Sequence, residues 1–221
     1  MDEQDCKELR KQKIRDTKTS LILDAALEVL SQKGYYETRL EDIADRAGFS
    51  KSALYRYYKD KDEIFFTIVV RERNKVFDKL TLDPQYRLSE ENHISENIRR
   101  ILTVAFTAFG ENLSFLLTLN SFQVAELINN LQKQSELMEI EKDFLCAENK
   151  MAEIMLGMFD KAKEKGEINT KLDSEQIFDF VQGFIFTKVK KWHQNKKLDN
   201  IDETVNQVLI FLSSGLGFMY K

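Results

Sequence analysis

The segment RLEDIADRAGFSKSALYRYY, residues 39–58, decides the fold of this chain of 221 residues. It predicts two short helices, over about 40–47 and about 50–57, because apolar residues recur at helical spacing in each. Gly48 between them tolerates the positive φ that a tight turn needs. Helices this short are marginal alone and must pack on each other, and the small Ala44 permits a close approach. This is the pattern of a helix-turn-helix.

The residues on either side also predict helices. Apolar residues at helical spacing indicate a helix that begins at Thr17 and ends before Gly34. Thr38 and Glu41 have the spacing of a capping box, so we expect Thr38 to cap the helix that follows. A longer helix is expected over about 60–80.

The remainder of the chain is predicted to be all-α. The sequence contains 16 Phe and 43% hydrophobic residues but only one Pro and 8 Gly, and few helix breakers interrupt it. The periodicity predicts further helices at 91–109, 112–119, 121–133, 135–165, 174–195 and 201–219.

Charge is distributed unevenly along the chain. The net charge is −4, which argues against a basic protein that binds nucleic acid with its whole surface. Residues 7–61 nevertheless carry 13 Lys and Arg against 9 Asp and Glu, whereas residues 75–221 carry 18 against 22. The N-terminal part is therefore the candidate partner of a polyanion.

Several classes of protein are disfavoured by what the sequence lacks. Cys6 and Cys146 are too far apart to form a disulfide framework, and His93 and His193 have no partners at metal or catalytic spacing. We find no nucleophile–base pair and no phosphate loop, so we expect neither an enzyme nor a cofactor or metal. No signal peptide or membrane span is recognisable, and we expect a cytoplasmic location.

At this point a family resemblance is specific. Residues 22–64 resemble the DNA-binding domain of the TetR family of helix-turn-helix transcriptional regulators. The resemblance is carried by Ala25-Ala26, Gly34-Tyr35, Thr38, Ile43-Ala44, Ala47-Gly48-Phe49-Ser50-Lys51, Leu54-Tyr55, Tyr58, Lys61 and Ile64. Phe49 and Tyr58 depart from the family pattern but preserve bulk, and Arg39 replaces a frequent capping Thr.

The resemblance implies an arrangement of domains. A three-helix DNA-binding domain is expected over 17–76, and its helix-turn-helix spans 39–58. Residues 1–16 before it are charged and lack an apolar face, so we expect a flexible arm there. A long helix joins the DNA-binding domain to a larger helical domain over 77–221, for ligand binding and dimerisation.

The resemblance also implies DNA-contacting residues. They are Thr38, Arg39, Ser50, Lys51, Ser52, Ala53, Tyr55, Arg56, Tyr57 and Lys61. Lys and Tyr donate to phosphate oxygens, which positions the recognition helix without reading sequence, while Lys51, Ser52 or Arg56 is suited to a base edge. Tyr55 is equally suited to packing, Arg56 to an ion pair with Asp60, and Tyr58 is expected in the core.

The C-terminal two thirds contain no strong motif. Helical spacing gives residues 177–192 and 205–219 an apolar stripe each, and the roles assigned to residues there follow mainly from the resemblance. The ligand pocket is expected among Phe106, Phe109, Phe122, Phe144, Met151, Met155 and Phe178. The dimer interface is expected among Phe184, Lys188, Trp192, Val205, Val208, Leu212 and Leu216. Both sets are also compatible with an ordinary helical core.

The function implied is that of a DNA-binding transcriptional regulator. We expect a homodimeric repressor released from a palindromic double-stranded operator by a small hydrophobic ligand. The alternative is an architectural or division-linked DNA-binding protein on the same scaffold, which would bind DNA without ligand release.

Overall fold

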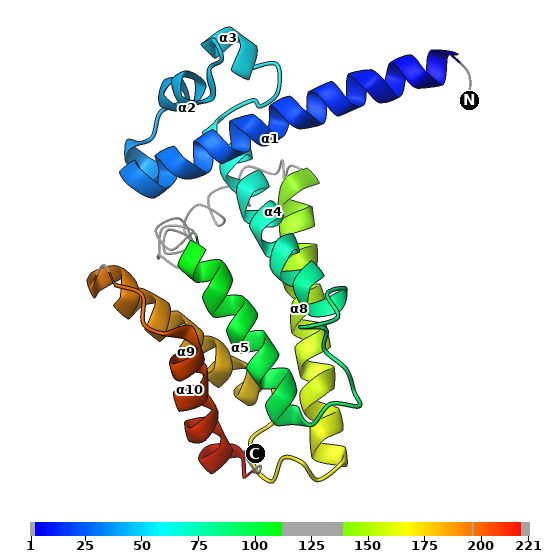
Figure 1. Ribbon diagram of the computed structural model, residues 1–221, viewed down its shortest axis with the longest axis vertical. Coiled ribbons are helices and arrows are strands. Elements are labelled where there is room, and N and C mark those ends of the chain that lie inside the picture. Colours follow the sequence, from blue (N-terminus) through cyan, green and yellow to red (C-terminus); the bar gives the residue numbers. More distant parts are fainter. Residues whose placement is uncertain (1–2, 112–138, 196, 218–221) are drawn as a thin grey trace. The chain divides into compact units, whose positions relative to one another are not determined.

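The computed structural model describes residues 3–111, 139–195 and 197–217, and the described chain is all-helical (Figure 1). It divides into two compact units, Met1–Val69 and Val70–Lys221. The first contains α1 (Glu3–Glu37), α2 (Leu40–Ala47) and α3 (Lys51–Leu54). The second contains α5 (Ile94–Glu111), α8 (Glu139–Glu164), α9 (Ser174–Asn195) and α10 (Ile201–Leu216). Helix α4 (Lys61–Thr81) begins in the first unit and ends in the second.

The first unit is built around the apolar face of α1. Ile22, Ala26 and Leu30 are fully or almost fully buried in it, as the periodicity predicts. Gly34 breaks the regular helix with a φ of 78°, a value that glycine adopts without strain. The chain then turns so that α2 packs against α1. Phe65 at the start of α4 completes the core and meets the ring of Tyr35 at 5.0 Å.

Helix α1 is longer than the sequence predicts, because it begins at Glu3 rather than at Thr17. Residues 7–18 are all exposed, so no apolar contact explains the extension. Lys, Arg, Glu and Gln are good helix formers, and extending a helix that is already nucleated costs little. A periodicity search for an apolar face cannot detect such a solvated helix.

The start of α2 corrects the predicted capping box by one residue. Arg39, not Thr38, is the N-cap residue, and its main-chain N–H donates to Asp42 Oδ2 at 3.0 Å. The hydroxyl of Thr38 instead donates to the carbonyl of Gly34 at 2.7 Å. Thr38 therefore closes the turn after α1, and the carboxylate of Asp42 rather than that of Glu41 satisfies the free main-chain donor.

The second unit has one apolar core, in which α5 packs against α8, α9 and α10. Trp192, Phe106 and Phe159 are its largest fully buried side chains. The predicted helices at 112–119 and 121–133 lie outside the described residues. The others are present with boundaries within a few residues of those predicted, except that α8 is described only from Glu139.

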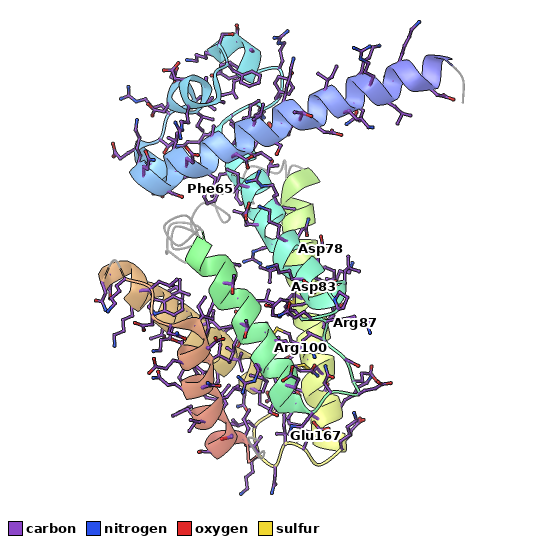
Figure 2. The ribbon with its side chains drawn as sticks, in the orientation of Figure 1. Phe65, Asp78, Asp83, Arg87, Arg100 and Glu167 are labelled. Atoms are coloured by element: carbon purple, nitrogen blue, oxygen red, sulfur yellow. The ribbon has the colours of Figure 1, made fainter. Side chains whose placement is uncertain are left out.

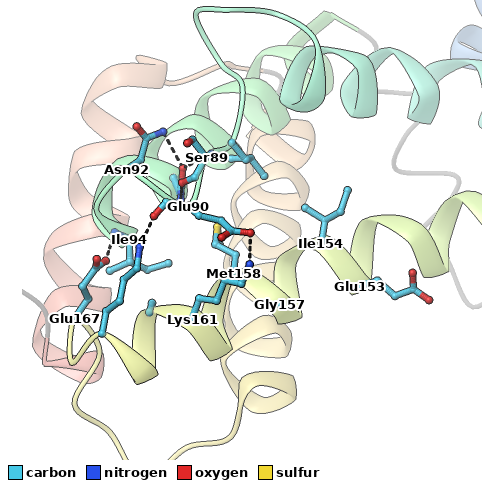
Figure 3. Close-up of a pocket in the computed structure, with 14 residues that line it drawn as sticks. Ser89, Glu90, Asn92, Ile94, Glu153, Ile154, Gly157, Met158, Lys161 and Glu167 are labelled. Atoms are coloured by element: carbon cyan, nitrogen blue, oxygen red, sulfur yellow. Dashed lines mark hydrogen bonds and ion pairs between the residues drawn. The ribbon is translucent and has the colours of Figure 1, made fainter.

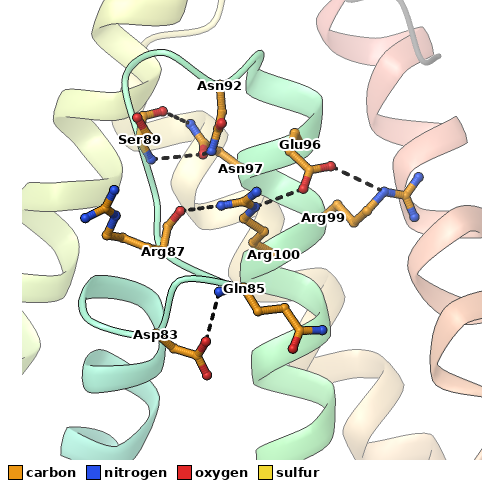
Figure 4. A network of polar contacts seen from close by, with 9 residues as sticks. All are labelled: Asp83, Gln85, Arg87, Ser89, Asn92, Glu96, Asn97, Arg99 and Arg100. Atoms are coloured by element: carbon orange, nitrogen blue, oxygen red, sulfur yellow. Dashed lines mark hydrogen bonds and ion pairs between the residues drawn. The ribbon is translucent and has the colours of Figure 1, made fainter.

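A polar network ties the loop between α4 and α5 to the first turns of α5 (Figure 4). The buried Asn97 donates to the carbonyl of Ser89 at 2.9 Å, and its Oδ1 accepts from the Ser89 N–H and the Asn92 amide. Arg100 donates to the carbonyl of Arg87 at 2.6 Å. Figure 2 places Arg87, Arg100 and Glu167 in this part of the second unit.

Candidate nucleic-acid interface

The turn between α2 and α3 has the geometry that the sequence predicts. Gly48 adopts the left-handed conformation with a φ of 73°, and the N–H of Phe49 donates to the carbonyl of Ala44 at 2.9 Å. The hydroxyl of Ser50 then caps α3 by accepting from the N–H of Ala53 at 3.2 Å. These bonds satisfy the ends of both helices and fix the direction of α3.

Helix α3 is shorter than expected because its regular part ends at Leu54. Residues 55–57 continue as hydrogen-bonded turns, in which the N–H of Tyr57 donates to the carbonyl of Leu54 at 2.9 Å. Leu54 and Tyr58 are both buried, which for Tyr58 confirms the core position that was expected. The opposite face, with Lys51, Ser52 and Arg56, is exposed. The α3 region therefore presents hydroxyl and cationic groups to solvent from a fixed apolar base.

The aromatic residues after α3 differ in exposure. Tyr55 is 49% exposed, and the ammonium of Lys51 lies 5.9 Å from the centre of its ring. Tyr57 is half-buried and meets the ring of Phe49 edge-on at 6.1 Å. Tyr55 is therefore free to reach a partner, whereas Tyr57 also helps to hold the turn.

Lys51 is engaged by α2. Its ammonium is ion-paired with the carboxylate of Glu41, and both side chains are about half exposed. The hydrogen bond between them lowers the pKa of the Glu41 carboxyl and raises the pKa of the Lys51 ammonium. A negative partner approaching α3 must therefore compete with Glu41 for Lys51, a role of Glu41 that helical spacing within α2 does not indicate.

Two predicted contact residues have internal roles. Thr38 is 2% exposed, with its hydroxyl on Gly34. Lys61 is half-buried, and its ammonium donates to the carbonyl of Tyr35 at 2.6 Å and to that of Thr38 at 3.0 Å. It also lies 4.2 Å from the centre of the Tyr35 ring. Lys61 thus stabilises the C-terminal end of α1, and burial lowers the pKa of its ammonium.

The remaining residues of the predicted interface are placed as follows. Arg39 is exposed at the first turn of α2, Ser50 is exposed at the start of α3, and Ala53 is half-buried within it. The oxygens of Ser50 and Ser52 lie 3.1 Å apart. The turn therefore brings together Ser50, Ser52 and Lys51 on one exposed surface.

The predicted ligand residues are only partly described. Phe106 and Met155 are buried in the core of the second unit, and Met151 and Phe178 pack against that core. Phe122 and the side chains of Phe109 and Phe144 lie outside the described part. The ring of Trp192 packs on Phe106 at a centroid distance of 5.1 Å. Within the described residues its buried indole N–H has no hydrogen-bond partner.

A pocket of about 320 Å³ lies elsewhere in the second unit, between α8 and the loop before α5 (Figure 3). Ile154 and Met158 line its apolar side. Polar groups on its other side already have partners within the protein. Lys161 pairs with Glu90, and Glu167 accepts from the N–H of Ile94 at 2.7 Å. None of the described residues predicted to bind ligand lines this pocket.

The face of α9 and α10 that was assigned to a dimer interface is mostly turned inward. Trp192, Val205, Val208, Leu212 and Leu216 are each no more than 3% exposed and belong to the core of the second unit. The apolar periodicity identified their buried face correctly, but within a single chain that face is already covered.

The exposed apolar residues of the same two helices are different. Phe180, Ile210 and Phe211 are 55–61% exposed. Phe184 is half-buried and lies 4.9 Å from Phe211 between ring centres. Lys188 is half-buried, and its ammonium is 3.8 Å from Asp199.

The described residues also lack a candidate metal-binding group and a candidate membrane-spanning helix. They contain no group of three or more His, Cys, Asp or Glu arranged to hold a metal ion. No described helix is both long and apolar enough to cross a membrane.

The fold and the exposed α3 surface define a helix-turn-helix DNA-binding protein. Residues 22–68 match the family model described as bacterial regulatory proteins, tetR family. The N-terminal domain of this chain is therefore similar to the DNA-binding domain of the TetR family of transcriptional regulators.

One similar protein and one solved structure match this chain over most of its length, and a further protein matches about a quarter of it. The fatty acid metabolism regulator protein of Bacillus subtilis (strain 168) is 25% identical over 197 residues, covering 88% of this chain and 93% of that protein. The transcriptional activator FasR of Mycolicibacterium smegmatis is 39% identical over 57 residues, about a quarter of each chain. The crystal structure of FadR from Bacillus subtilis in complex with stearoyl-CoA has the same fold, with a TM-score of 0.68 and 21% identity over 89% of this chain and 98% of that one.

Proposed function

We propose that this regulator is a homodimeric repressor that leaves a near-palindromic operator when its second unit binds an acyl-CoA thioester or a related hydrophobic acyl compound. The observation that carries the DNA part is the exposed face of α3, held by the buried Leu54 and Tyr58. Ser52, Lys51 and Arg56 reach base edges, while Arg39, Ser50 and Tyr55 donate to phosphates.

The remaining predicted contacts have narrower roles in this proposal. Lys61 keeps one of its three donors for a phosphate while the other two hold the carbonyls after α1. Thr38 acts only by positioning the start of α2, because its side chain is buried. Ala53 and Tyr57 provide apolar surface for a thymine methyl group.

The dimer is proposed to form through the outward face of α9 and α10. Phe180, Ile210 and Phe211 place large apolar groups in water in a single chain. Exposed large apolar side chains commonly mark an interface, and a two-fold axis would apply this face to its own copy. In this proposal, the buried residues that the resemblance assigned to the interface pack in the core beneath this face. They are Trp192, Val205, Val208, Leu212 and Leu216.

The acyl ligand is proposed from the relatives and from the core chemistry together. The chain is similar over most of its length to a regulator of fatty acid metabolism, and a protein of the same fold was crystallised with stearoyl-CoA. Phe106, Met151, Met155 and Phe178 supply aromatic and thioether surface suited to an acyl chain. The Trp192 N–H supplies a buried donor for a carbonyl oxygen.

Binding of ligand and of DNA must then be reciprocally coupled. Helix α4 is continuous from the first unit into the second, and so provides a covalent path between them. The recognition helices of a dimer must lie about 34 Å apart to enter successive turns of the major groove. A change of a few ångströms in that separation is enough to release the operator.

The test is a binding titration with DNA from upstream of the protein's own gene, with random duplex as competitor and salt varied. Competition-resistant binding to a near-palindromic site supports the regulator, and its loss on adding stearoyl-CoA supports the effector. Trp192 is the only tryptophan, so quenching of its fluorescence by stearoyl-CoA, but not by free coenzyme A, reports entry into the core. Site-specific binding that no acyl compound weakens would favour the architectural alternative.

A further inference from the structure

The N-terminal part of α1 extends far beyond the residues that build the helix-turn-helix (Figure 1). Residues 7–18 contain six lysines and arginines against two carboxylates, a net charge of +4. Every one of these side chains is exposed. A helical segment with this excess of positive charge and no apolar contact to make is a surface suited to a polyanion.

The positive charges are concentrated on one side of this segment. On a helix of 3.6 residues per turn, four of them fall within an arc of about 80°. We call them the basic stripe, which consists of Lys7, Lys11, Arg15 and Lys18. Of the two carboxylates, Asp16 projects from the other side of the helix, whereas Glu8 borders the stripe and its carboxylate lies 3.7 Å from the Lys11 ammonium. Arg10 and Lys13 lie outside this arc, so positive charge is densest along the stripe without being confined to it.

The basic stripe lies on the side of α1 that α2 covers further along. Glu28 and Lys33 mark that side, because Glu28 pairs with Arg46 of α2 and the ammonium of Lys33 lies 2.8 Å from Asp42. Helical spacing places the whole basic stripe within the arc that these two α1 residues bound. The stripe and the helix-turn-helix therefore share one side of α1.

The apolar residues of the segment do not form a second face. Leu9 and Ile14 are both about half exposed, and at helical spacing they point to well-separated sides of the helix. A helix that lies in a lipid surface needs one contiguous apolar face. This segment has none, so charge attraction to duplex DNA fits it better than insertion into an anionic membrane.

We propose that the basic stripe binds the phosphate backbone of duplex DNA next to the half-site that α3 occupies. This inference rests on the proposed function, because it assigns the flanking duplex to a protein already placed on DNA by its helix-turn-helix. Lys7 and Lys18 are about 16 Å apart along the axis at 1.5 Å per residue. The stripe therefore spans about five base pairs beyond the half-site at 3.4 Å each.

The test compares two variants of the full-length protein with equal net charge. The stripe variant combines Lys7→Gln, Lys11→Gln, Arg15→Gln and Lys18→Gln. The matched control combines Lys79→Gln, Arg87→Gln, Lys171→Gln and Lys197→Gln, which are exposed positions of the second unit. Because neither set contributes to a core, circular dichroism should show wild-type helical content and thermal unfolding for both.

Binding constants are then measured against salt concentration on the selected operator and on a random duplex. The slope of log K against log salt should become shallower by roughly 0.9 for each phosphate contact that the stripe variant loses. The control should keep the wild-type slope. Hydroxyl-radical footprints on the operator should shorten by about five base pairs on each outer side only in the stripe variant.

The outcomes separate this proposal from the function on which it rests. If the stripe variant and the control have the same slope on both duplexes, the basic stripe does not bind DNA, whether or not the operator is recognised. If no site is preferred over random DNA, the regulator proposal fails, yet a shallower slope of the stripe variant on random duplex still supports the stripe. Stripe-dependent sedimentation with phosphatidylserine vesicles, without any effect on DNA, would instead assign the segment to a membrane surface and overturn the proposal.

Discussion

The ammonium of Lys61 lies 2.6 Å from the carbonyl oxygen of Tyr35, and the same ammonium donates to the carbonyl of Thr38. The first residue of α4 thereby closes the C-terminal end of α1. A lysine that family resemblance alone assigns to DNA has a structural contact that accounts for its position. Its proposed role in DNA binding and its role in stability must therefore be measured separately.

Lys61→Met keeps an unbranched side chain of similar length but removes all three donors and the charge near the Tyr35 ring. We expect the free energy of unfolding of the first unit to fall by about 1–2 kcal/mol, as measured by urea denaturation. Under conditions where the variant is folded, the salt slope of DNA binding should become shallower by about one unit. An unchanged slope with reduced stability would leave Lys61 a purely structural role.

Glu41→Gln should strengthen DNA binding. It releases Lys51 and removes a negative charge beside the proposed DNA-binding surface, whereas an exposed ion pair contributes little to stability. Fluorescence anisotropy should show a lower Kd and a steeper salt slope. Glu28→Gln is the matched control, because it also removes one negative charge and breaks the ion pair between Glu28 of α1 and Arg46 of α2. Equal effects of the two substitutions would mean that only net charge matters.

Phe211→Glu and Leu212→Glu should have different consequences although the residues are adjacent. Phe211 is 61% exposed, so its variant should remain folded, sediment as a monomer and lose operator binding. Leu212 is buried, and a carboxylate there should destabilise the second unit by more than about 3 kcal/mol. A folded, dimeric Phe211→Glu protein would refute the proposed interface.

Asn97→Ala should destabilise the second unit by about 1–3 kcal/mol, because it leaves the main-chain groups of Ser89 without their partner in a buried site. Urea denaturation followed by tryptophan fluorescence measures the loss. The exposed Asn74→Ala provides the comparison. Similar unfolding midpoints for the two variants would show that the network in Figure 4 does not hold the loop before α5.

Acid should weaken the start of α2. The side chain of Lys33 and the main-chain N–H of Arg39 lower the pKa of the Asp42 carboxyl below its usual range. Because the folded-state pKa is depressed, this stabilisation is present at neutral pH and is lost as the pH falls below about 4 through the folded value. Thermal unfolding from pH 7 to pH 3 should be less pH-dependent in Asp42→Asn than in wild type or in Asp45→Asn. Identical pH profiles would contradict the role given to Asp42.

Local chemistry determined the helix-turn-helix from the sequence alone. Gly48 permits a left-handed turn, Ser50 caps the helix after it, and Leu54 and Tyr58 face the core by helical spacing. Each of these features depends on residues only a few positions apart, so the printed sequence contains all the necessary information. The predicted DNA contacts at the exposed positions remain predictions.

Only the tertiary structure decided which partner each side chain meets. Thr38 and Lys61 engage the end of α1, and Glu41 captures Lys51, because folding brings together residues that are distant in the sequence. The same limit applied to α9 and α10. Helical periodicity located an apolar face, but only the packing of α5 showed that Leu212 belongs to the core and left Phe211 for an outer surface. The sequence by itself thus determined the described helices that have an apolar face, and the three-dimensional packing determined what those faces contact.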